Sequence, residues 1–342
     1  MVEKVTISDV ARKAGVSKAT VSGVINAKST VNHETREHVL NVMKELNFRP
    51  KGTARNLKQV NLGKSIGLII KDINNSFFTN IAMGVKEYAA KKGYLVFIAS
   101  SENRNEDEIK FSDQFTAKDI KGAIIAPSLN GDAEIEHLFK LKLLNFPFVL
   151  LEKIKGIQTN VVRIDNRKAM KSAVNYLIDS GHTDIVHFSG AENASHTYEC
   201  IDGFRSAYSE SHLIFKNEMV IPMGVNHHES YKNCILYFKK RKQKNYPTAI
   251  ICASDQQALG VVTALRELNL GIPEDISIIG YDDTLYANFY PVQLTNIRIP
   301  MRKMGFKAAE ILIRNIESKV LLPPEDIVFN AELIIRKSTR KL

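Results

Sequence analysis

The 342-residue chain has no tryptophan, only three cysteines and no long apolar run. A membrane-spanning helix needs about 18 consecutive apolar residues, and residues 1–6 show no apolar signal-peptide core. Cys200, Cys234 and Cys252 lie far apart and form no C-x-x-C pair, so neither a disulfide framework nor a zinc site is supported. We therefore expect a cytoplasmic protein without metal or cofactor, whose cysteines are small core residues.

The composition and the charge distribution narrow the class further. Hydrophobic residues make up 44% and charged residues 25%, which excludes a disordered chain, and the length favours more than one domain. The net charge is +10, and residues 1–58 contribute +6 of it, from eleven Lys and Arg against five Asp and Glu. A concentrated basic segment is typical of contact with nucleic acid phosphates.

The basic segment has the pattern of two short helices joined by a turn. Thr6 and Asp9 have capping-box spacing, which predicts a first helix that begins near Ile7. Gly15 supplies a turn, and Ser17 can cap a second helix whose apolar residues recur at helical spacing. The pattern therefore predicts a helix-turn-helix.

A third helix fits the stretch that Asn32 would cap and that Pro50 would end. Residues 6–22, Thr-Ile-Ser-Asp-Val-Ala-Arg-Lys-Ala-Gly-Val-Ser-Lys-Ala-Thr-Val-Ser, resemble the headpiece of the lactose-repressor (LacI/GalR) family of bacterial transcription regulators, and residues 31–37 and 46–50 continue the match. This similarity makes a purely structural three-helix bundle the weaker interpretation.

The resemblance implies that the second helix, about residues 18–25, lies in the major groove of DNA. Lys18, Ala19 and Gly23 occupy the positions that family members use to read bases. Many relatives carry arginine or another side chain at the position of Gly23, and glycine offers no hydrogen bond to a base, so readout must depend on Lys18, Ala19 or a neighbour such as Asn26. Ser17 is either a phosphate donor or only a helix cap. The other expected contacts of the headpiece with DNA are Thr6, Thr20, Ser22 and Asn32.

Residues 51–58 alone would be interpreted as a linker. The resemblance implies a hinge helix that orders on the operator, pairs with its dimer mate in the minor groove and inserts Leu57 between base pairs. Ala54 is the small residue that permits close helix approach, whereas Gly52 costs about 1 kcal/mol in a helix. Thr53, Arg55 and Lys58 complete the expected hinge contacts.

From residue 62 onward, short apolar runs alternate with helical patterns, which predicts βαβ units and parallel sheets. We predict strands at 65–70, 94–99, 122–126, 147–151, 161–164, 184–188, 249–252 and 276–280, with helices at 78–92, 106–118 and 133–143.

The family resemblance covers essentially the whole chain, including residues 254–260 and 273–283. It implies an N-terminal all-α helix-turn-helix headpiece (1–58) and an α/β periplasmic-binding-protein-like body of two doubly wound lobes (62–342), which binds an effector and dimerises. The chain would cross between the lobes near 162, 288 and 323. Lobe 1 would comprise about 62–161 and 289–322, and lobe 2 about 162–288 and 323–342.

Ligands of open α/β sheets bind beyond the carboxyl ends of the strands. Asp282 follows a strand, and the resemblance implies that it bonds the effector; Glu152 takes the place of a ligand-facing acid. Phe77 and Phe78 occupy positions where relatives stack aromatic rings on a ligand, although phenylalanine at a helix start is equally a core residue. Asp255 is either a ligand contact or a structural cap.

Cys200 stands where many relatives carry an arginine, three residues before Gly203-Phe204. Loss of arginine removes a planar fork of five donors, so an ordinary sugar-binding arrangement does not follow. Either His196 or Tyr198 contacts the effector instead, or the cleft takes an unusual effector or none.

We therefore expect a homodimeric regulator, a repressor of transcription, that binds a palindromic operator and whose DNA affinity depends on a sugar or nucleobase-like molecule in the cleft. The alternative is a regulator that answers to a protein partner or to no effector. An enzyme is not expected, because the sequence has no nucleophile–base set, metal cluster or phosphate-binding glycine loop.

Overall fold

The computed structural model describes residues 5–25, 31–46, 48, 64–128, 135–190, 194–241, 245–288 and 293–342. The chain divides into two compact units, Met1–Leu62 and Gly63–Leu342, which are called the headpiece and the body below. In the described residues, no helix has the length and apolar character needed to cross a membrane.

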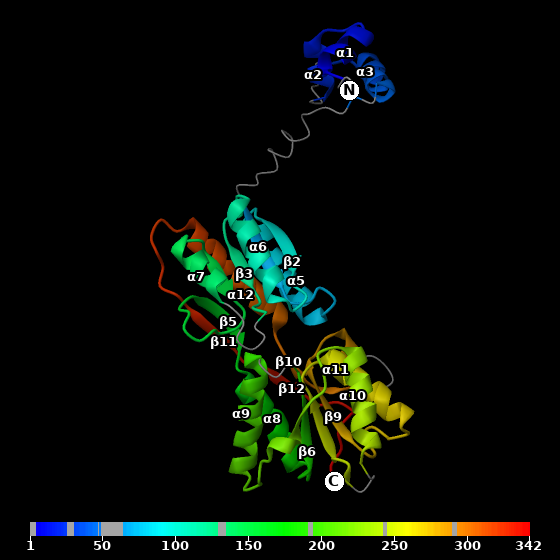
Figure 1. The fold of residues 1–342 in the computed structure, drawn as a ribbon, viewed down its shortest axis with the longest axis vertical. Coiled ribbons are helices and arrows are strands. Elements are labelled where there is room, and N and C mark those ends of the chain that lie inside the picture. The colour runs from blue at the N-terminus through cyan, green and yellow to red at the C-terminus, as the bar shows by residue number, and fades with distance from the viewer. Residues whose placement is uncertain are drawn as a thin grey trace. The chain divides into compact units, whose positions relative to one another are not determined.

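The headpiece contains three helices, α1 (Ile7–Lys13), α2 (Lys18–Ile25) and α3 (His33–Glu45) (Figure 1). The Asp9 carboxylate accepts hydrogen bonds from the Thr6 backbone N–H (2.9 Å) and hydroxyl (2.6 Å), which starts α1 at the predicted residue. The Ser17 hydroxyl oxygen accepts from the Thr20 N–H at 3.0 Å and starts α2 in the same way.

Helix α3 begins after Asn32, whose side-chain oxygen accepts from the backbone N–H of Thr35 at 2.8 Å. Val10, Val21 and Val39, one from each helix, are fully buried and form the centre of a small apolar core. The predicted helix-turn-helix with a third helix is therefore the observed architecture.

The body contains two six-stranded sheets. Sheet A has the order β11-β5-β4-β3-β1-β2 and is parallel throughout, and sheet B has the order β12-β10-β9-β8-β6-β7, in which only β12 runs antiparallel to its neighbour. The strands of sheet A are β1 (Ser65–Ile70), β2 (Leu95–Ser100), β3 (Ala123–Ile125), β4 (Phe148–Leu150), β5 (Asn160–Ile164) and β11 (Asp326–Phe329). Those of sheet B are β6 (Ile185–Ser189), β7 (Val220–Pro222), β8 (Ala249–Cys252), β9 (Ser277–Asp282), β10 (Thr295–Arg298) and β12 (Glu332–Ile334).

Helices cover both faces of each sheet, which confirms the predicted doubly wound lobes. In lobe 1, α5 (Ser76–Lys91) packs against α12 (Met301–Glu317), and α6 (Asn105–Ala117) lies beside α7 (Glu136–Leu143). In lobe 2, α8 (Asn166–Asp179) packs against α9 (Ser195–Glu210), and α10 (His227–Lys239) against α11 (Asp255–Glu267). Short 3-10 helices span Asn217–Met219 and Leu285–Asn288.

Two glycines allow α5 and α12 to approach closely. A Cβ at Gly84 would lie 2.0 Å from the Arg302 carbonyl oxygen, and one at Gly305 would lie 2.0 Å from the Ile81 carbonyl oxygen. Neither distance is compatible with a methyl group, so only glycine fits on both sides of the crossing.

The chain passes between the two sheets three times. Strand β5 belongs to sheet A, so the first passage follows residue 164, close to the predicted position 162. Strand β10 belongs to sheet B and β11 to sheet A, so the second and third passages follow residues 298 and 329, later than the predicted 288 and 323. The pair Pro323-Pro324 precedes β11 instead of marking a passage.

Candidate functional site

The start of α2 presents an exposed face. Ser17, Lys18 and Ala19 are exposed, whereas Thr20 and Ser22 are half-buried. The exposed basic residues Arg12 and Lys13 pair with carboxylates of the headpiece, at 3.1 Å to Asp9 and 3.0 Å to Glu45. Lys18 forms no ion pair within the described part of the headpiece, so its ammonium is available to an external acceptor.

Gly23, an expected reading position, is buried. A Cβ there would lie 3.0 Å from the Val31 Cγ2 atom, so the side chain found in many relatives would require Val31 to move. Exposed contacts at the start of α2 are therefore limited to Lys18 and its neighbours.

The other expected DNA contacts divide into two groups. Thr6, Ser17 and Asn32 are exposed, and their side chains also make the hydrogen bonds that start the three helices. Six expected contacts lie outside the described residues, namely Asn26, Thr53, Ala54, Arg55, Leu57 and Lys58.

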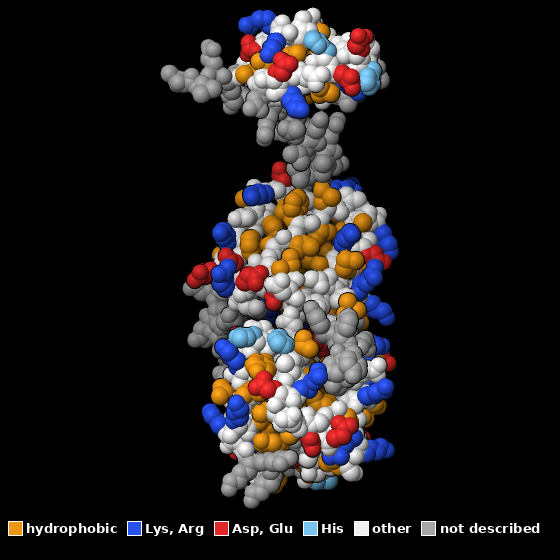
Figure 2. Space-filling view, turned by 90° about the vertical axis from the view of Figure 1, so that its right-hand side faces the viewer, with side chains coloured by type: hydrophobic (Ala, Val, Ile, Leu, Met, Phe, Trp, Pro, Cys, Tyr) orange, Lys and Arg blue, Asp and Glu red, His pale blue; other side chains and the backbone are white. Residues whose placement is uncertain are grey.

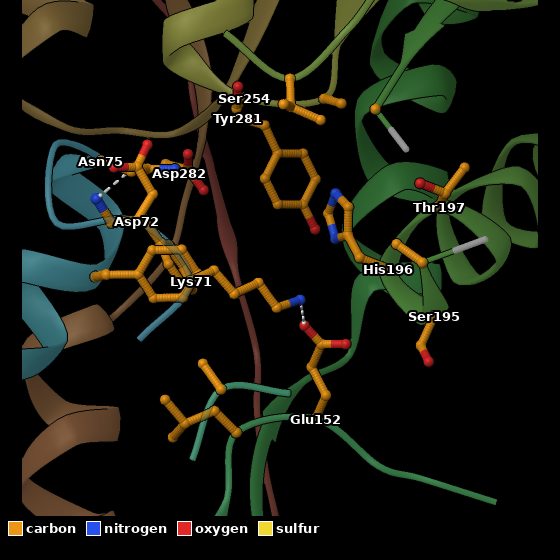
Figure 3. Close-up of a pocket in the computed structure, with 18 of the residues that line it drawn as sticks. Lys71, Asp72, Asn75, Glu152, Ser195, His196, Thr197, Ser254, Tyr281 and Asp282 are labelled. Carbon is orange, nitrogen blue, oxygen red and sulfur yellow. Dashed lines mark hydrogen bonds and ion pairs between the residues drawn. The ribbon is translucent and has the colours of Figure 1, made fainter. Parts of the chain in front are cut away.

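A cavity of about 410 Å3 lies between the lobes of the body, at the carboxyl ends of both sheets (Figure 3). Of the seven expected effector contacts, five line the cavity: Phe77, Phe78, Glu152, His196 and Asp282. Asp255 and Tyr198 are not part of the lining.

Asp282, at the end of β9, is only 7% exposed, and its backbone has the left-handed φ of 103° that residues other than glycine rarely adopt. Burial raises the pKa of its carboxyl group well above the ordinary range. A buried acid on a constrained turn beside a cavity is typical of a binding site, since solvent cannot satisfy it and a ligand can.

Asp255 stabilises the turn that follows Asp282. Its carboxylate accepts from the Thr284 N–H (2.6 Å), the Thr284 hydroxyl (2.8 Å) and the Asn296 side-chain amide (2.5 Å). Burial raises the pKa of Asp255 to about 6. The residue that caps the following helix is Ser254, whose hydroxyl oxygen accepts from the backbone N–H of Gln257. Asp255 is therefore a structural residue, but it stabilises the turn instead of capping the helix.

Asp283 fixes the other side of the same turn. Its carboxylate pairs with Arg298 at 2.6 Å and with Arg336 at 2.7 Å, and its N–H donates to the Asn296 side chain at 3.0 Å. Sequence reasoning missed this brace, because its partners lie on β10 and beyond β12. Together with Asp255 it determines where the Asp282 carboxylate lies.

An aromatic wall flanks Asp282 on the lobe 2 side. The Tyr281 and His196 rings meet edge to face, with centroids 4.9 Å apart (Figure 3). Burial lowers the pKa of His196, which favours the neutral ring. The Tyr281 hydroxyl donates to Asn166 at 2.7 Å, and the Asn166 amide donates to Glu199 at 2.7 Å, so the wall continues to a second carboxylate of the lining.

Cys200, at the position of the missing arginine, is fully buried in the core. Its sulfur lies 3.7 Å from the Nε2 atom of His196, and burial raises the pKa of its thiol, which disfavours a reactive thiolate. Tyr198 is 57% exposed and does not line the cavity. Of the two proposed replacements for arginine, only His196 therefore reaches the cavity.

The lobe 1 wall contains an ion pair that the sequence did not reveal. The Lys71 ammonium lies 2.5 Å from the Glu152 carboxylate, and both line the cavity (Figure 3). The Phe77 and Phe78 rings meet edge to face 5.1 Å apart; Phe78 also belongs to the core. Lys71 directly follows β1, so its place at the carboxyl end of a strand is a signal that the sequence does contain. Among the described residues, no cluster of three or more His, Cys, Asp or Glu side chains could hold a metal ion.

Two family models match the chain. Residues 6–51 match the bacterial regulatory proteins of the lacI family, and residues 174–339 match the periplasmic binding protein-like domain. The HTH-type transcriptional repressor PurR of Actinobacillus pleuropneumoniae serotype 3 is 33% identical over 341 residues, which cover 98% of this chain and 99% of that protein. PurR of Vibrio vulnificus is 32% identical over 341 residues, which again cover 98% of this chain and 99% of that protein.

Solved structures show the same fold. A complex of the transcriptional regulator CelR with cellobiose has a TM-score of 0.72 at 23% identity, covering 98% of this chain and 99% of that one. A LacI family regulator from Enterococcus faecium with bound ribose has a TM-score of 0.70 at 25% identity, covering 82% and 100%. The lac repressor dimer bound to operator has a TM-score of 0.69 at 24% identity, covering 99% and 100%. With a helix-turn-helix headpiece, a two-lobed body and relatives along its full length, the chain belongs to the lacI family of bacterial transcriptional regulators.

Proposed function

We propose that this chain represses transcription by binding a palindromic operator as a homodimer in the cytoplasm, and that a small molecule in the cleft between the lobes controls its affinity for DNA. The observation that carries the proposal is the cavity of about 410 Å3, lined from both lobes and by the buried Asp282, in a chain whose second headpiece helix begins with exposed residues. The PurR relatives are named as repressors, and the Enterococcus faecium neighbour holds ribose.

An apolar face of the body supports the dimer. Strand β2 is an edge strand of sheet A, and Leu95, Phe97 and Ile98 on it are between 41% and 49% exposed, together with Met83 of α5 at 48%. Figure 2 shows hydrophobic side chains gathered on the side of lobe 1 that carries β2 and α5. In lobe 2, Leu259 and Leu285 are also exposed. A contiguous apolar patch of this kind suits a second copy of the chain.

The cleft can control DNA binding because its walls belong to different lobes. A ligand that touches Lys71 or Glu152 in lobe 1 and Asp282 or His196 in lobe 2 stabilises one relative position of the lobes. In a dimer, that position sets the separation of the two headpieces, so ligand and operator affinities become coupled in both directions.

Thermal melting with ribose, cellobiose, hypoxanthine and adenosine tests the effector site, because a ligand that binds only the folded state raises the melting temperature. We expect at least one compound to raise the melting temperature and to change operator affinity. Asp282→Ala should abolish both responses and leave operator binding without ligand intact. If Asp282→Ala responds as the parent protein does, the cleft is not the effector site, and control by a protein partner becomes the better account.

A further inference from the structure

The Lys and Arg side chains in the described part of the cavity lining all form ion pairs. Lys71 pairs with Glu152 at 2.5 Å. Arg163 lies 2.9 Å from Asp326, and Lys153 lies 3.2 Å from the same carboxylate. A phosphate or carboxylate ligand would therefore have to break an existing ion pair to gain a cationic partner.

The carboxylates of the lining are in excess. Asp72, Glu102, Glu199 and Asp282 line the cavity, and none of the four forms an ion pair with a described Lys, Arg or His. Asp282 is more than nine-tenths buried, and Glu199 is half-buried. The described lining thus holds five carboxylates against three Lys and Arg side chains, so acids are in excess.

Two of these acids flank the aromatic wall. Asp282 follows Tyr281 directly, and Glu199 is joined to the Tyr281 hydroxyl through Asn166. Burial raises the pKa of both carboxyl groups, and at Glu199 the Asn166 amide and the nearby Arg163 offset only part of this effect. A ligand that brings a positive charge to either carboxylate lowers the cost of burying that carboxylate's charge.

A helix end adds a positive field to this wall. Ser195 and His196 at the start of α9 line the cavity, and the cap residue Ala194 makes no side-chain hydrogen bond to the helix. A helix N-terminus carries roughly half a positive charge. It can bind a hydroxyl oxygen of a ligand, but it is weaker than the carboxylates together.

We propose that the cleft selects a hydroxyl-bearing ligand that carries a positively charged amine, of the amino sugar class, and rejects phosphorylated or carboxylated ligands. The proposal rests on the proposed effector function of the cleft. The carboxylates of Asp282 and Glu199 attract the ammonium group, the Tyr281 ring packs on the ligand skeleton, and the start of α9 donates to a hydroxyl oxygen.

Matched ligands that differ only in charge test the selection. Glucosamine, glucose and glucose 6-phosphate, and galactosamine, galactose and galactose 6-phosphate, are titrated into the full-length protein by calorimetry at pH 7. In each series the amine should bind best, at least about tenfold more tightly than the neutral sugar, with the phosphate weakest. Equal or tighter binding of a phosphate, or no binding of either amine, overturns the proposal.

A single variant tests whether the carboxylate acts through its charge. Glu199→Gln keeps the size of the side chain, and it should weaken amine binding about tenfold while it changes neutral sugar binding little. Glu210→Gln, on the same helix but at its exposed end, should change neither. Equal losses for amine and neutral sugar with Glu199→Gln would contradict the charge role.

The operator response separates this inference from the proposed function. If a phosphate or neutral sugar changes DNA affinity more than either amine does, the amine selection is wrong while the effector function stands. If neither these sugars nor the ribose, cellobiose, hypoxanthine and adenosine of the melting test change DNA affinity, both fail.

Discussion

The Lys71 ammonium lies 2.5 Å from the Glu152 carboxylate in the wall of the cleft, and the two side chains are only 17% and 24% exposed. Removing one partner leaves the other charge poorly hydrated. We expect Lys71→Met to lower the free energy of unfolding by about 1 to 3 kcal/mol, and Glu152→Met in the same chain to recover part of the loss. Urea unfolding of the four proteins of this cycle measures the coupling, and a coupling near zero would contradict the importance of the pair.

Gly305→Ala should destabilise the body severely. The added methyl group would lie 2.0 Å from the Ile81 carbonyl oxygen, a backbone atom that can move only if α5 and α12 separate. We expect a loss of about 3 kcal/mol or more in the free energy of unfolding, or no folded protein. Gly190→Ala is the control, because its nearest neighbour would be 3.8 Å away. Similar melting temperatures for the two variants would show that the helix crossing is looser than described.

Acid should weaken the body through His187. Its Nδ1 atom lies 3.0 Å from the Ile251 carbonyl oxygen, and burial lowers its pKa to about 4. The unfolded chain takes up the proton near pH 6.5, so the stability that the neutral ring provides is complete above pH 6.5 and is lost as the pH falls toward 4.

At pH 5 the lost stability amounts to about 2 kcal/mol relative to pH 8. His187→Gln keeps a donor for the Ile251 carbonyl and should remove this part of the pH dependence. Urea unfolding of both proteins at pH 8 and pH 5 gives the change in the free energy of unfolding between the two pH values. Acids with a raised pKa, such as Asp255, contribute with the opposite sign, but equally in both proteins, so their contribution cancels when the two changes are subtracted. Identical pH dependence of the two proteins would refute the assignment to His187.

Phe97→Lys should dissociate the proposed dimer, since it places a charge within the exposed apolar face of β2. Leu143→Lys is the matched control, because Leu143 is 83% exposed on α7, away from that edge of the sheet. Sedimentation analysis should give a dimer for the parent protein and for the Leu143 variant, and a monomer for the Phe97 variant. A Phe97 variant that remains dimeric would place the interface elsewhere.

Local features of the fold could be predicted from the sequence. Thr6, Ser17 and Asn32 start the headpiece helices through hydrogen bonds to residues three positions away, which is why those starts were predictable. Strand β1 has the predicted bounds because six consecutive buried residues leave a strong signal. Strands β7, β10, β11 and β12 were not predicted, because none of them contains a run of buried apolar residues like those of β3, β4 and β8, and they depend on pairing with distant segments.

The residues of the cleft likewise divide into those that local sequence predicts and those that depend on distant contacts. Asp282 and Glu152 lie in the lining because they stand at or just after the carboxyl ends of strands, a property visible in the sequence. Tyr198 does not, because two residues of helix turn it away from the side that His196 occupies. The pairs Lys71 with Glu152 and Arg163 with Asp326 join residues 81 and 163 positions apart, and a single sequence gives no sign of such distances.

Selection of bound sequences from random duplex DNA by the full-length protein tests the central claim most directly, that this chain is a dimeric operator-binding regulator. We expect enrichment of one palindrome with two half-sites, and its loss in Lys18→Ala but not in Lys110→Ala, which changes an exposed lysine of the body. Enrichment of no sequence, or of one without two-fold symmetry, would contradict it.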